Sequence, residues 1–247
     1  MQKVNEKTYA ELAKEWDEIA DKRYQQMANG IDNSYDKIIT PFILDSTNKT
    51  DLTSLIDAGC GNGILLSKIE SHAKASVGID ISKKNISIAR NLCKTSKFDC
   101  CSIEEFSKKN KKLKATTIIC CMVLMDTPSL TDTVSALSRL LKKNGNLIWV
   151  ITHPFFWPRY WGYENEDWFK YSDSIPIEAF FKISNEETTF KTTHTHHPLW
   201  KYINTFHNNG LSIETISELM PIKNDNFNLE NQPNYPRFLA GICRKLF

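Results

Sequence analysis

A glycine-rich run and a later carboxylate are the residues whose types and spacing point most directly to chemistry. The run DAGCGNG occupies residues 57–63, and its glycines permit a tight turn where a ligand can approach backbone that carries no Cβ. Asp80 ends the apolar stretch VGID, at about the twenty-residue spacing where an acid binds the hydroxyls of a nucleotide ribose. The pair predicts a site for an adenosyl group.

Two details of the turn distinguish between the cofactors that carry adenosine. Ile64 stands where the dinucleotide fingerprint has its third glycine, so the close helix-to-strand packing of that fingerprint is lost. Asp57 stands at the entrance of the turn, where its charge disfavours a pyrophosphate and favours the ammonium end of a cationic methionyl group. The turn therefore suits a sulfonium cofactor better than a nicotinamide one.

A purely structural reading of both acids stays open. Asp is common at strand ends and before helices, where it caps a helix or forms a turn. Ser82, however, already has the position of the cap of the next predicted helix. This leaves the Asp80 carboxylate free for a ligand.

The chain resembles the class I methyltransferases, which are Rossmann-like enzymes whose first motif looks like DxGxGxG and whose second strand ends in an acid. Similar family members carry stretches like MVLMD after the fourth strand and HP after the fifth, matched here at residues 122–126 and 153–154. The resemblance covers most of the chain. It implies S-adenosyl-L-methionine as the methyl donor, with S-adenosyl-L-homocysteine as the product.

The resemblance also assigns parts of the cofactor to particular residues. Gly59, Cys60 and Gly61 would line the methionyl moiety. Asp80 would bind both ribose hydroxyls, and Ile81 would lie against the adenine. A charge-assisted hydrogen bond of this kind contributes about 1.5–3 kcal/mol.

One position departs from the family pattern. The family usually has an Asp after the third strand for the adenine amino group, whereas CSIEEF offers Ser102 followed by Ile103. Ser102 can accept a hydrogen bond but carries no charge, so weaker adenine anchoring is expected. Cys121, after the fourth strand, has a position whose backbone often faces the cofactor, and a plain core cysteine is an equal alternative.

Histidines are the candidate bases for an acceptor that arrives protonated. His153 follows the fifth predicted strand at the ligand end of the sheet, and we predict it as the base or as a substrate-positioning group. A role in capping the turn before Pro154 is an equal alternative. The cluster HTHH at 194–197 lacks a well-placed carboxylate or thiolate, so no metal is predicted.

Short apolar stretches alternate with helical patterns through the first two thirds of the chain, as in βαβ units. The predicted strands are 52–57, 75–80, 97–101, 115–121, 146–151, 211–216 and 236–246. Helices are predicted from Ile64, from Lys83, and from Leu130 to a stop at Asn144–Gly145. Because the early crossovers are short and helical, we expect a doubly wound α/β fold with a mostly parallel seven-stranded sheet and helices on both faces. Ligands bind at the carboxyl ends of such strands.

Two segments outside this alternation are predicted to cover the site. An amphipathic helix lies within residues 1–50, which we interpret as a lid. Residues 153–197 are rich in aromatic side chains and include one or two strands outside the main sheet, so we interpret them as an inserted cap. No repeat or linker divides the chain, and residues 1–247 are predicted to form one domain.

Composition excludes several classes of protein. Hydrophobic residues make up 41% and charged residues 24% of the chain, which is typical of a globular protein. The net charge of +2 is too small to favour a nucleic-acid partner. No apolar run approaches bilayer-spanning length, and the N-terminal residues lack a signal-peptide core. We therefore expect a cytoplasmic protein without a membrane partner.

The sequence thus predicts transfer of a methyl group to an oxygen or nitrogen atom of a small organic acceptor. Alternatives that stay open are a peptide terminus or RNA as the acceptor, and a non-catalytic protein that binds S-adenosylmethionine. The aromatic cap favours a flat or apolar small molecule.

Overall fold

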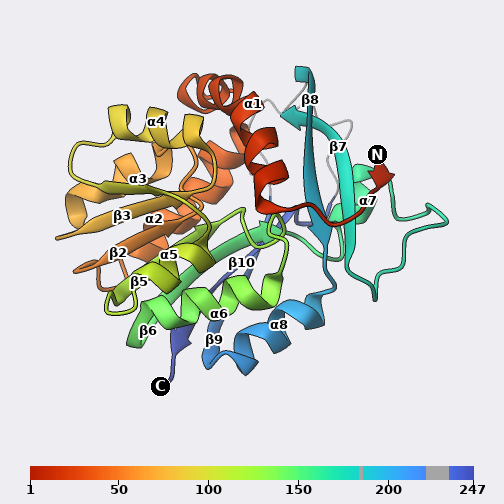
Figure 1. Ribbon diagram of the computed structural model, residues 1–247. Coiled ribbons are helices and arrows are strands. Elements are labelled where there is room, and N and C mark those ends of the chain that lie inside the picture. The colour runs from red at the N-terminus through yellow and green to blue at the C-terminus, as the bar shows by residue number, and fades with distance from the viewer. Residues whose placement is uncertain (184–185, 221–233) are drawn as a thin grey trace.

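The computed structural model describes residues 1–183, 186–220 and 234–247 (Figure 1). Its strands are β1 (Gln2–Lys3), β2 (Leu55–Ala58), β3 (Ser76–Asp80), β4 (Lys97–Cys100), β5 (Ala115–Cys121), β6 (Leu141–Thr152), β7 (Ile175–Ile183), β8 (Glu186–His196), β9 (Leu211–Leu219) and β10 (Phe238–Lys245). Its helices are α1 (Tyr9–Ala28), α2 (Thr40–Thr47), α3 (Ile64–Ile69), α4 (Lys83–Leu92), α5 (Ile103–Lys109), α6 (Leu130–Leu140), α7 (Trp157–Trp161) and α8 (Leu199–Asn208). A π-helical turn (Tyr35–Ile39) and a 3-10 turn (Glu70–His72) complete the described helical segments.

Seven strands form the main sheet, in the order β4-β3-β2-β5-β6-β10-β9. The five strands from β4 to β6 pair in parallel, whereas β10 lies antiparallel to both β6 and β9. The strand order reverses direction between β2 and β5, and this is the switch point where ligands bind in open α/β sheets. The predicted mostly parallel seven-stranded sheet is confirmed.

Helices cover both faces of this sheet, as Figure 1 shows. Ile118 of β5 belongs to the buried cluster that includes side chains of α5, α6 and α8, and its neighbour Ile119 belongs to the cluster that includes α2 and α3. Successive side chains of a strand point to opposite faces, so a strand buried on both sides reads as a continuous apolar run. The run TTIICC of β5 has this property.

One helix boundary differs from the prediction. Helix α6 ends at Leu140, and Leu141 already has extended backbone and pairs with Ala115 as the first residue of β6. The predicted stop at Asn144–Gly145 is therefore wrong. Asn144 instead has a φ of 61° within β6, next to a shift in register between β5 and β6. Leu141 satisfies the helical spacing but is buried by strand pairing.

A second sheet with the order β1-β7-β8 forms the cap. Strands β7 and β8 are the antiparallel pair expected within residues 153–197, and Gln2 and Lys3 add an edge strand that the sequence did not indicate. Helix α1 lies between the two sheets and contacts both α4 and β8. The division into a lid, a sheet domain and a cap within one domain stays a prediction.

The seven cysteines are all free thiols, and they differ in exposure. Cys100, at the end of β4, is the exposed one, while Cys60, Cys93, Cys120 and Cys243 are buried. Burial raises the pKa of these buried thiols, so they are poorly reactive. Separately, no helix among the described residues is long and apolar enough to cross a membrane.

Candidate active site

The glycine turn between β2 and α3 is tied to the neighbouring strand. The backbone N–H groups of Gly59 and Cys60 donate to the Ile79 carbonyl at 2.7 and 2.9 Å. Gly59 has a φ of +81°, and a Cβ there would overlap the Val123 side chain. Gly61 has a φ of +52° with open space where a Cβ would lie, and it faces a large cavity. Position 59 therefore requires glycine because of its packing against Val123, whereas Gly61 leaves room for a ligand.

Asp80 is held at the end of β3 by two backbone donors. Its Oδ2 accepts from the Gly61 N–H at 2.9 Å, and its Oδ1 accepts from the Ser82 N–H at 2.8 Å. Burial raises the pKa of Asp80 to about 6, although these hydrogen bonds act to lower it. Each carboxylate oxygen retains acceptor capacity. Ser82 caps α4 as predicted, with its hydroxyl accepting from Asn85 N–H at 3.1 Å.

Asp57 lies almost wholly buried at the end of β2, with 1% of its surface exposed. Its Oδ2 has no hydrogen-bond partner and borders the cavity. Burial, followed by the nearby charge of Asp80, raises the pKa of Asp57 to about 7. A buried carboxylate oxygen without a donor is costly unless a ligand supplies one, and a cationic amine fits that need.

The cavity has a volume of about 1790 Å³ and lies between the carboxyl ends of the central strands, α1 and the cap. Eight of the ten predicted site residues line it, namely Asp57, Gly59, Cys60, Gly61, Asp80, Ile81, Ile103 and Cys121. The structure therefore brings together residues from the ends of β2, β3, β4 and β5. The volume exceeds the usual range of small-molecule pockets, so it has room for two ligands side by side.

Ser102 is not among the residues that line the cavity. Its hydroxyl accepts from the Glu105 N–H at 3.1 Å and caps α5. The neighbours Cys101 and Ile103 line the cavity instead. Ser102, which stands where the family usually has an Asp, therefore caps α5 and does not contribute its side chain to the cavity.

His153 is likewise not a lining residue. It is buried, its Nε2 lies 3.2 Å from Glu218 Oε1, and its Nδ1 accepts from the backbone N–H groups of Phe155 and Phe156. Both ring nitrogens therefore have partners within the protein. This matches the turn-capping alternative, and the structure gives no direct contact between His153 and the cavity.

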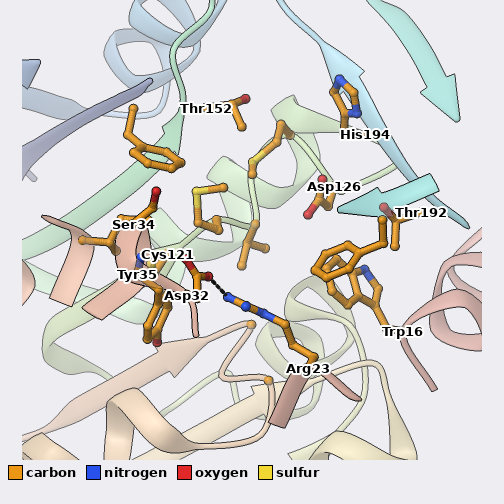
Figure 2. Close-up of a pocket in the computed structure, with 18 of the residues that line it drawn as sticks. Trp16, Arg23, Asp32, Ser34, Tyr35, Cys121, Asp126, Thr152, Thr192 and His194 are labelled. Atoms are coloured by element: carbon orange, nitrogen blue, oxygen red, sulfur yellow. Dashed lines mark hydrogen bonds and ion pairs between the residues drawn. The ribbon is translucent and has the colours of Figure 1, made fainter. Parts of the chain in front are cut away.

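The polar residues that line the cavity but were not predicted as site residues include Arg23, Asp126, His194 and Arg237. In Figure 2, Asp126, His194 and Thr192 lie on one side of the pocket, and the Arg23–Asp32 ion pair lies in another part of the wall. Burial raises the pKa of Asp126 and lowers the pKa of His194 to about 4. Both groups are thus biased toward their neutral forms, and His194 Nε2 has no partner.

Part of the aromatic cap faces the cavity. The lining aromatic residues of α1, α7 and β7 are Tyr9, Trp16, Trp157, Tyr160, Trp161, Phe180 and Phe181. Trp16 meets Phe181 edge to face, with ring centres 6.2 Å apart. Tyr163, Trp168 and Phe169 do not line the cavity and instead pack in a cluster that Trp157 and Trp161 also contact. The aromatic core of the cap therefore continues into the wall of the cavity through these two tryptophans.

The other two histidines of the HTHH cluster, His196 and His197, have structural partners. His196 Nε2 bonds the Tyr171 carbonyl at 3.1 Å, and His197 Nδ1 bonds Ser174 Oγ at 2.8 Å. Within residues 1–183, 186–220 and 234–247, no group of three or more His, Cys, Asp or Glu side chains is arranged to hold a metal ion.

Comparison with known proteins gives a family match and a shared fold. A family model described as a methyltransferase domain matches residues 49–209. A search of curated proteins finds no match. Among solved structures, an S-adenosylmethionine-dependent methyltransferase from Clostridium acetobutylicum ATCC 824 aligns with a TM-score of 0.62 at 19% identity, covering 90% of this chain and 100% of that one.

Two further structures have similar scores. A methyltransferase from Listeria monocytogenes, described as putative and S-adenosylmethionine-dependent, has a TM-score of 0.62 at 19% identity and covers 80% of this chain and 92% of its own. The PH0226 protein from Pyrococcus horikoshii OT3 has a TM-score of 0.63 at 15% identity and covers 86% and 90%. The predicted Rossmann-like fold and the predicted methyl donor, S-adenosylmethionine, are confirmed by this family and fold. The chain belongs to the methyltransferase-domain family and is an enzyme of that kind.

Proposed function

We propose that this enzyme transfers the methyl group of S-adenosylmethionine to an oxygen or nitrogen atom of a small organic acceptor held in the cavity beneath the cap. The observation that carries the proposal is the pair of carboxylates beside the glycine turn. Asp57 presents an oxygen without a donor to the cavity, and Asp80 is oriented toward the same space by Gly61 and Ser82.

The chain offers a partner for each polar part of the donor. Asp57 would accept from the ammonium group, and Asp80 would accept from the ribose hydroxyls. Arg23 pairs with Asp32 at 2.7 Å through Nη2, while its buried Nη1 has no partner and could bind the donor's carboxylate. Ile81 and Ile103 supply apolar surface for the adenine.

The protein's main task in this reaction is alignment. When bound beside Asp57 and Asp80, the donor would supply a methyl group that is activated by its sulfonium and would leave as a neutral thioether when a lone pair of the acceptor displaces it. Holding the reactants in line and excluding water can contribute up to about 7–11 kcal/mol. Helix α1 and the cap sheet cover the cavity, which serves both requirements.

His194 and Asp126 support an acceptor that carries an O–H or N–H group. The neutral imidazole of His194 has an unpartnered Nε2, so it can accept a hydrogen bond from the acceptor and then its proton. The weak basicity of a buried imidazole favours positioning over strong base catalysis.

Calorimetry tests the donor site. We expect S-adenosylhomocysteine to bind the wild type and the Asp80→Asn variant to bind it about 10- to 100-fold more weakly, since charge-assisted hydrogen bonds are lost. Asp99→Asn is the matched control, because Asp99 lies on the adjacent strand β4 but is exposed and outside the cavity. Binding of NADH in place of S-adenosylhomocysteine would refute the proposal.

Turnover tests the reaction itself. A panel of phenols, amines and carboxylic acids should include acceptors that release S-adenosylhomocysteine in the presence of enzyme. If RNA or peptide acceptors alone are methylated, the small-molecule class is wrong. Donor binding without turnover on any acceptor class would favour a non-catalytic binding protein.

A cytoplasmic location is part of the same proposal. Its support is the set of seven unpaired cysteines, a usage typical of a reducing compartment.

A further inference from the structure

Arg237 is an arginine without a counterion in the wall of the cavity. Among the described residues, it is the one arginine whose guanidinium has neither a hydrogen-bond nor an ion-pair partner. Its Nε is shielded from solvent, and burial lowers the pKa of Arg237. The side chain as a whole is partly buried, and a partly desolvated cation is normally paired.

Aromatic rings and a second arginine surround this cation. The Arg237 guanidinium carbon lies 4.0 Å from the ring centre of Tyr160, and that of Arg159 lies 5.3 Å from the ring centre of Tyr235. Tyr235 in turn stacks on Phe156, with ring centres 4.9 Å apart and planes at 12°. All five residues line the cavity. They form a wall that offers flat apolar surface beside a positive charge.

The acidic residues of the cavity do not neutralise Arg237. Asp32 pairs with Arg23, Asp57 lies at the end of β2, and Asp80 lies at the end of β3, where it accepts from Gly61. Asp126 lies on the side of the pocket that carries His194 and Thr192 in Figure 2. None of these four carboxylates contacts Arg237 within the part of the chain that the structure describes. The donor's own carboxylate already has a candidate partner in Arg23.

We propose that Arg237 binds a carboxylate group of the methyl acceptor, and that the rings of Phe156, Tyr160 and Tyr235 hold the flat apolar part of the same molecule. This inference rests on the proposed function. A single unpaired guanidinium balances one negative charge, and its planar fork matches a carboxylate. Arg159 lies 3.8 Å from Glu164 and both side chains are largely exposed, so Arg237 is the more buried of the two arginines in this wall and the better partner for a buried carboxylate.

Binding of the acceptor's carboxylate to Arg237 restricts which atom of the acceptor can receive the methyl group. A carboxylate whose oxygens accept from arginine has reduced lone-pair availability and is a poor nucleophile. The new bond therefore forms at a different oxygen or nitrogen of the acceptor, whose proton leaves to His194 or to water. The carboxylate anchors the acceptor and stays unmethylated.

The test measures ligand binding with S-adenosylhomocysteine already bound. A panel of hydroxybenzoates and aminobenzoates is compared with the corresponding benzamides by calorimetry. We expect acids to bind the wild type about tenfold or more tightly than their amides, as loss of one charge-assisted pair predicts. Arg237→Gln should abolish this preference, and Arg237→Lys should retain part of it. Arg244→Gln is the matched control, since Arg244 lies on β10, the strand that begins one residue after Arg237, but pairs with Glu214.

The outcomes separate this inference from the proposed function. If the wild type binds S-adenosylhomocysteine but no acid binds more tightly than its amide, the carboxylate subsite is wrong and the proposed function stands. If Arg237→Gln weakens S-adenosylhomocysteine itself tenfold while the variant keeps the wild-type melting temperature, Arg237 belongs to the donor site and the inference is overturned. If the wild type does not bind S-adenosylhomocysteine, the proposed function fails first.

Discussion

Gly59 combines two constraints that a side chain cannot meet. Its φ of +81° is strained for any L-residue, and a Cβ would overlap Val123. Left-handed backbone alone costs about 1–2 kcal/mol. We expect Gly59→Ala to lower the free energy of unfolding by more than that and to abolish binding of S-adenosylhomocysteine, as measured by urea unfolding and calorimetry.

Gly162 is the matched control for this substitution. It has nearly the same φ, +79°, but has open space around the position of a Cβ. Gly162→Ala therefore isolates the backbone strain and should cost about 1–2 kcal/mol with donor binding preserved. Equal losses of stability in the two variants would show that the overlap with Val123 contributes nothing.

The two carboxylates of the turn predict a pH dependence. Burial raises the pKa of Asp57 to about 7 and that of Asp80 to about 6, above the ordinary value near 4. The folded protein thus holds these protons more tightly than the unfolded chain, and this contribution to stability is lost as pH rises from about 4 through 7. The ionised forms are the ones that accept from a ligand.

S-adenosylhomocysteine should therefore bind several-fold more tightly at pH 8 than at pH 5.5, and binding near pH 6.5 should release protons. Calorimetry in two buffers of different ionisation enthalpy measures that release. The Asp57→Asn variant should release fewer protons on binding, because the contribution of Asp57 is lost. An affinity that is constant across this pH range would contradict the protonation states inferred here.

Some residues of the site could be predicted from the local sequence, whereas others depend on contacts between segments that are far apart in the chain. Asp57 and Asp80 could be predicted, because each ends a strand next to a turn and the ends of adjacent parallel strands meet. Arg237 and His194 could not be predicted, because their roles depend on a cavity closed by segments far apart in sequence. His153 has the expected place after β6, but the adjacent Glu218 and the following backbone occupy its nitrogens.

At the scale of elements, one acidic residue joins α1 to the cap. The Glu15 carboxylate accepts from the N–H and the hydroxyl of Thr193 on β8 at 2.9 and 3.0 Å, and it also pairs with Lys7. We expect Glu15→Ala to lower the free energy of unfolding by about 1.5–3 kcal/mol. Limited proteolysis should also cut within α1 faster than in the wild type.

Glu18→Ala is the control on the same helix. Glu18 faces Lys14 at 4.0 Å, and both side chains are largely exposed, so the pair contributes little. The two variants lose the same helix-forming carboxylate but only Glu15 contacts the cap. If both resist protease like the wild type, the contact with Thr193 does not hold α1 in place.

The regular elements could be predicted where periodicity and turn residues agreed. The sequence indicated the strands of the main sheet and the starts of α3, α4 and α6 at Ile64, Lys83 and Leu130. It misplaced the end of α6, because Leu141 fits a helical face and a buried strand equally well. It did not indicate β1, since two exposed polar residues become a strand only by pairing with β7.

At the scale of the whole molecule, the cavity is lined by both sheets and by α1, so a ligand there should stabilise all three. S-adenosylhomocysteine at 100 times its dissociation constant should add about 2.7 kcal/mol, which raises the melting temperature by about 5–10 °C for a chain of this size. Calorimetric melting measures the shift. Asp80→Asn should show a smaller shift at the same ligand concentration, and an equal rise with NADH would contradict the assignment of the cavity.

Cys100 is the exposed cysteine of the protein, so a thiol-reactive probe can be attached there selectively. Cys100 lies at the end of β4, and its Sγ is 3.7 Å from the carbonyl oxygen of Ile81, the residue expected beside the adenine. Burial raises the pKa of the Cys100 thiol, but the residue is exposed. The buried cysteines, Cys60, Cys93, Cys120 and Cys243, are shielded from reagents. A maleimide fluorophore would therefore label this position first, at mildly alkaline pH, and its emission would report the arrival and departure of the nucleoside in real time.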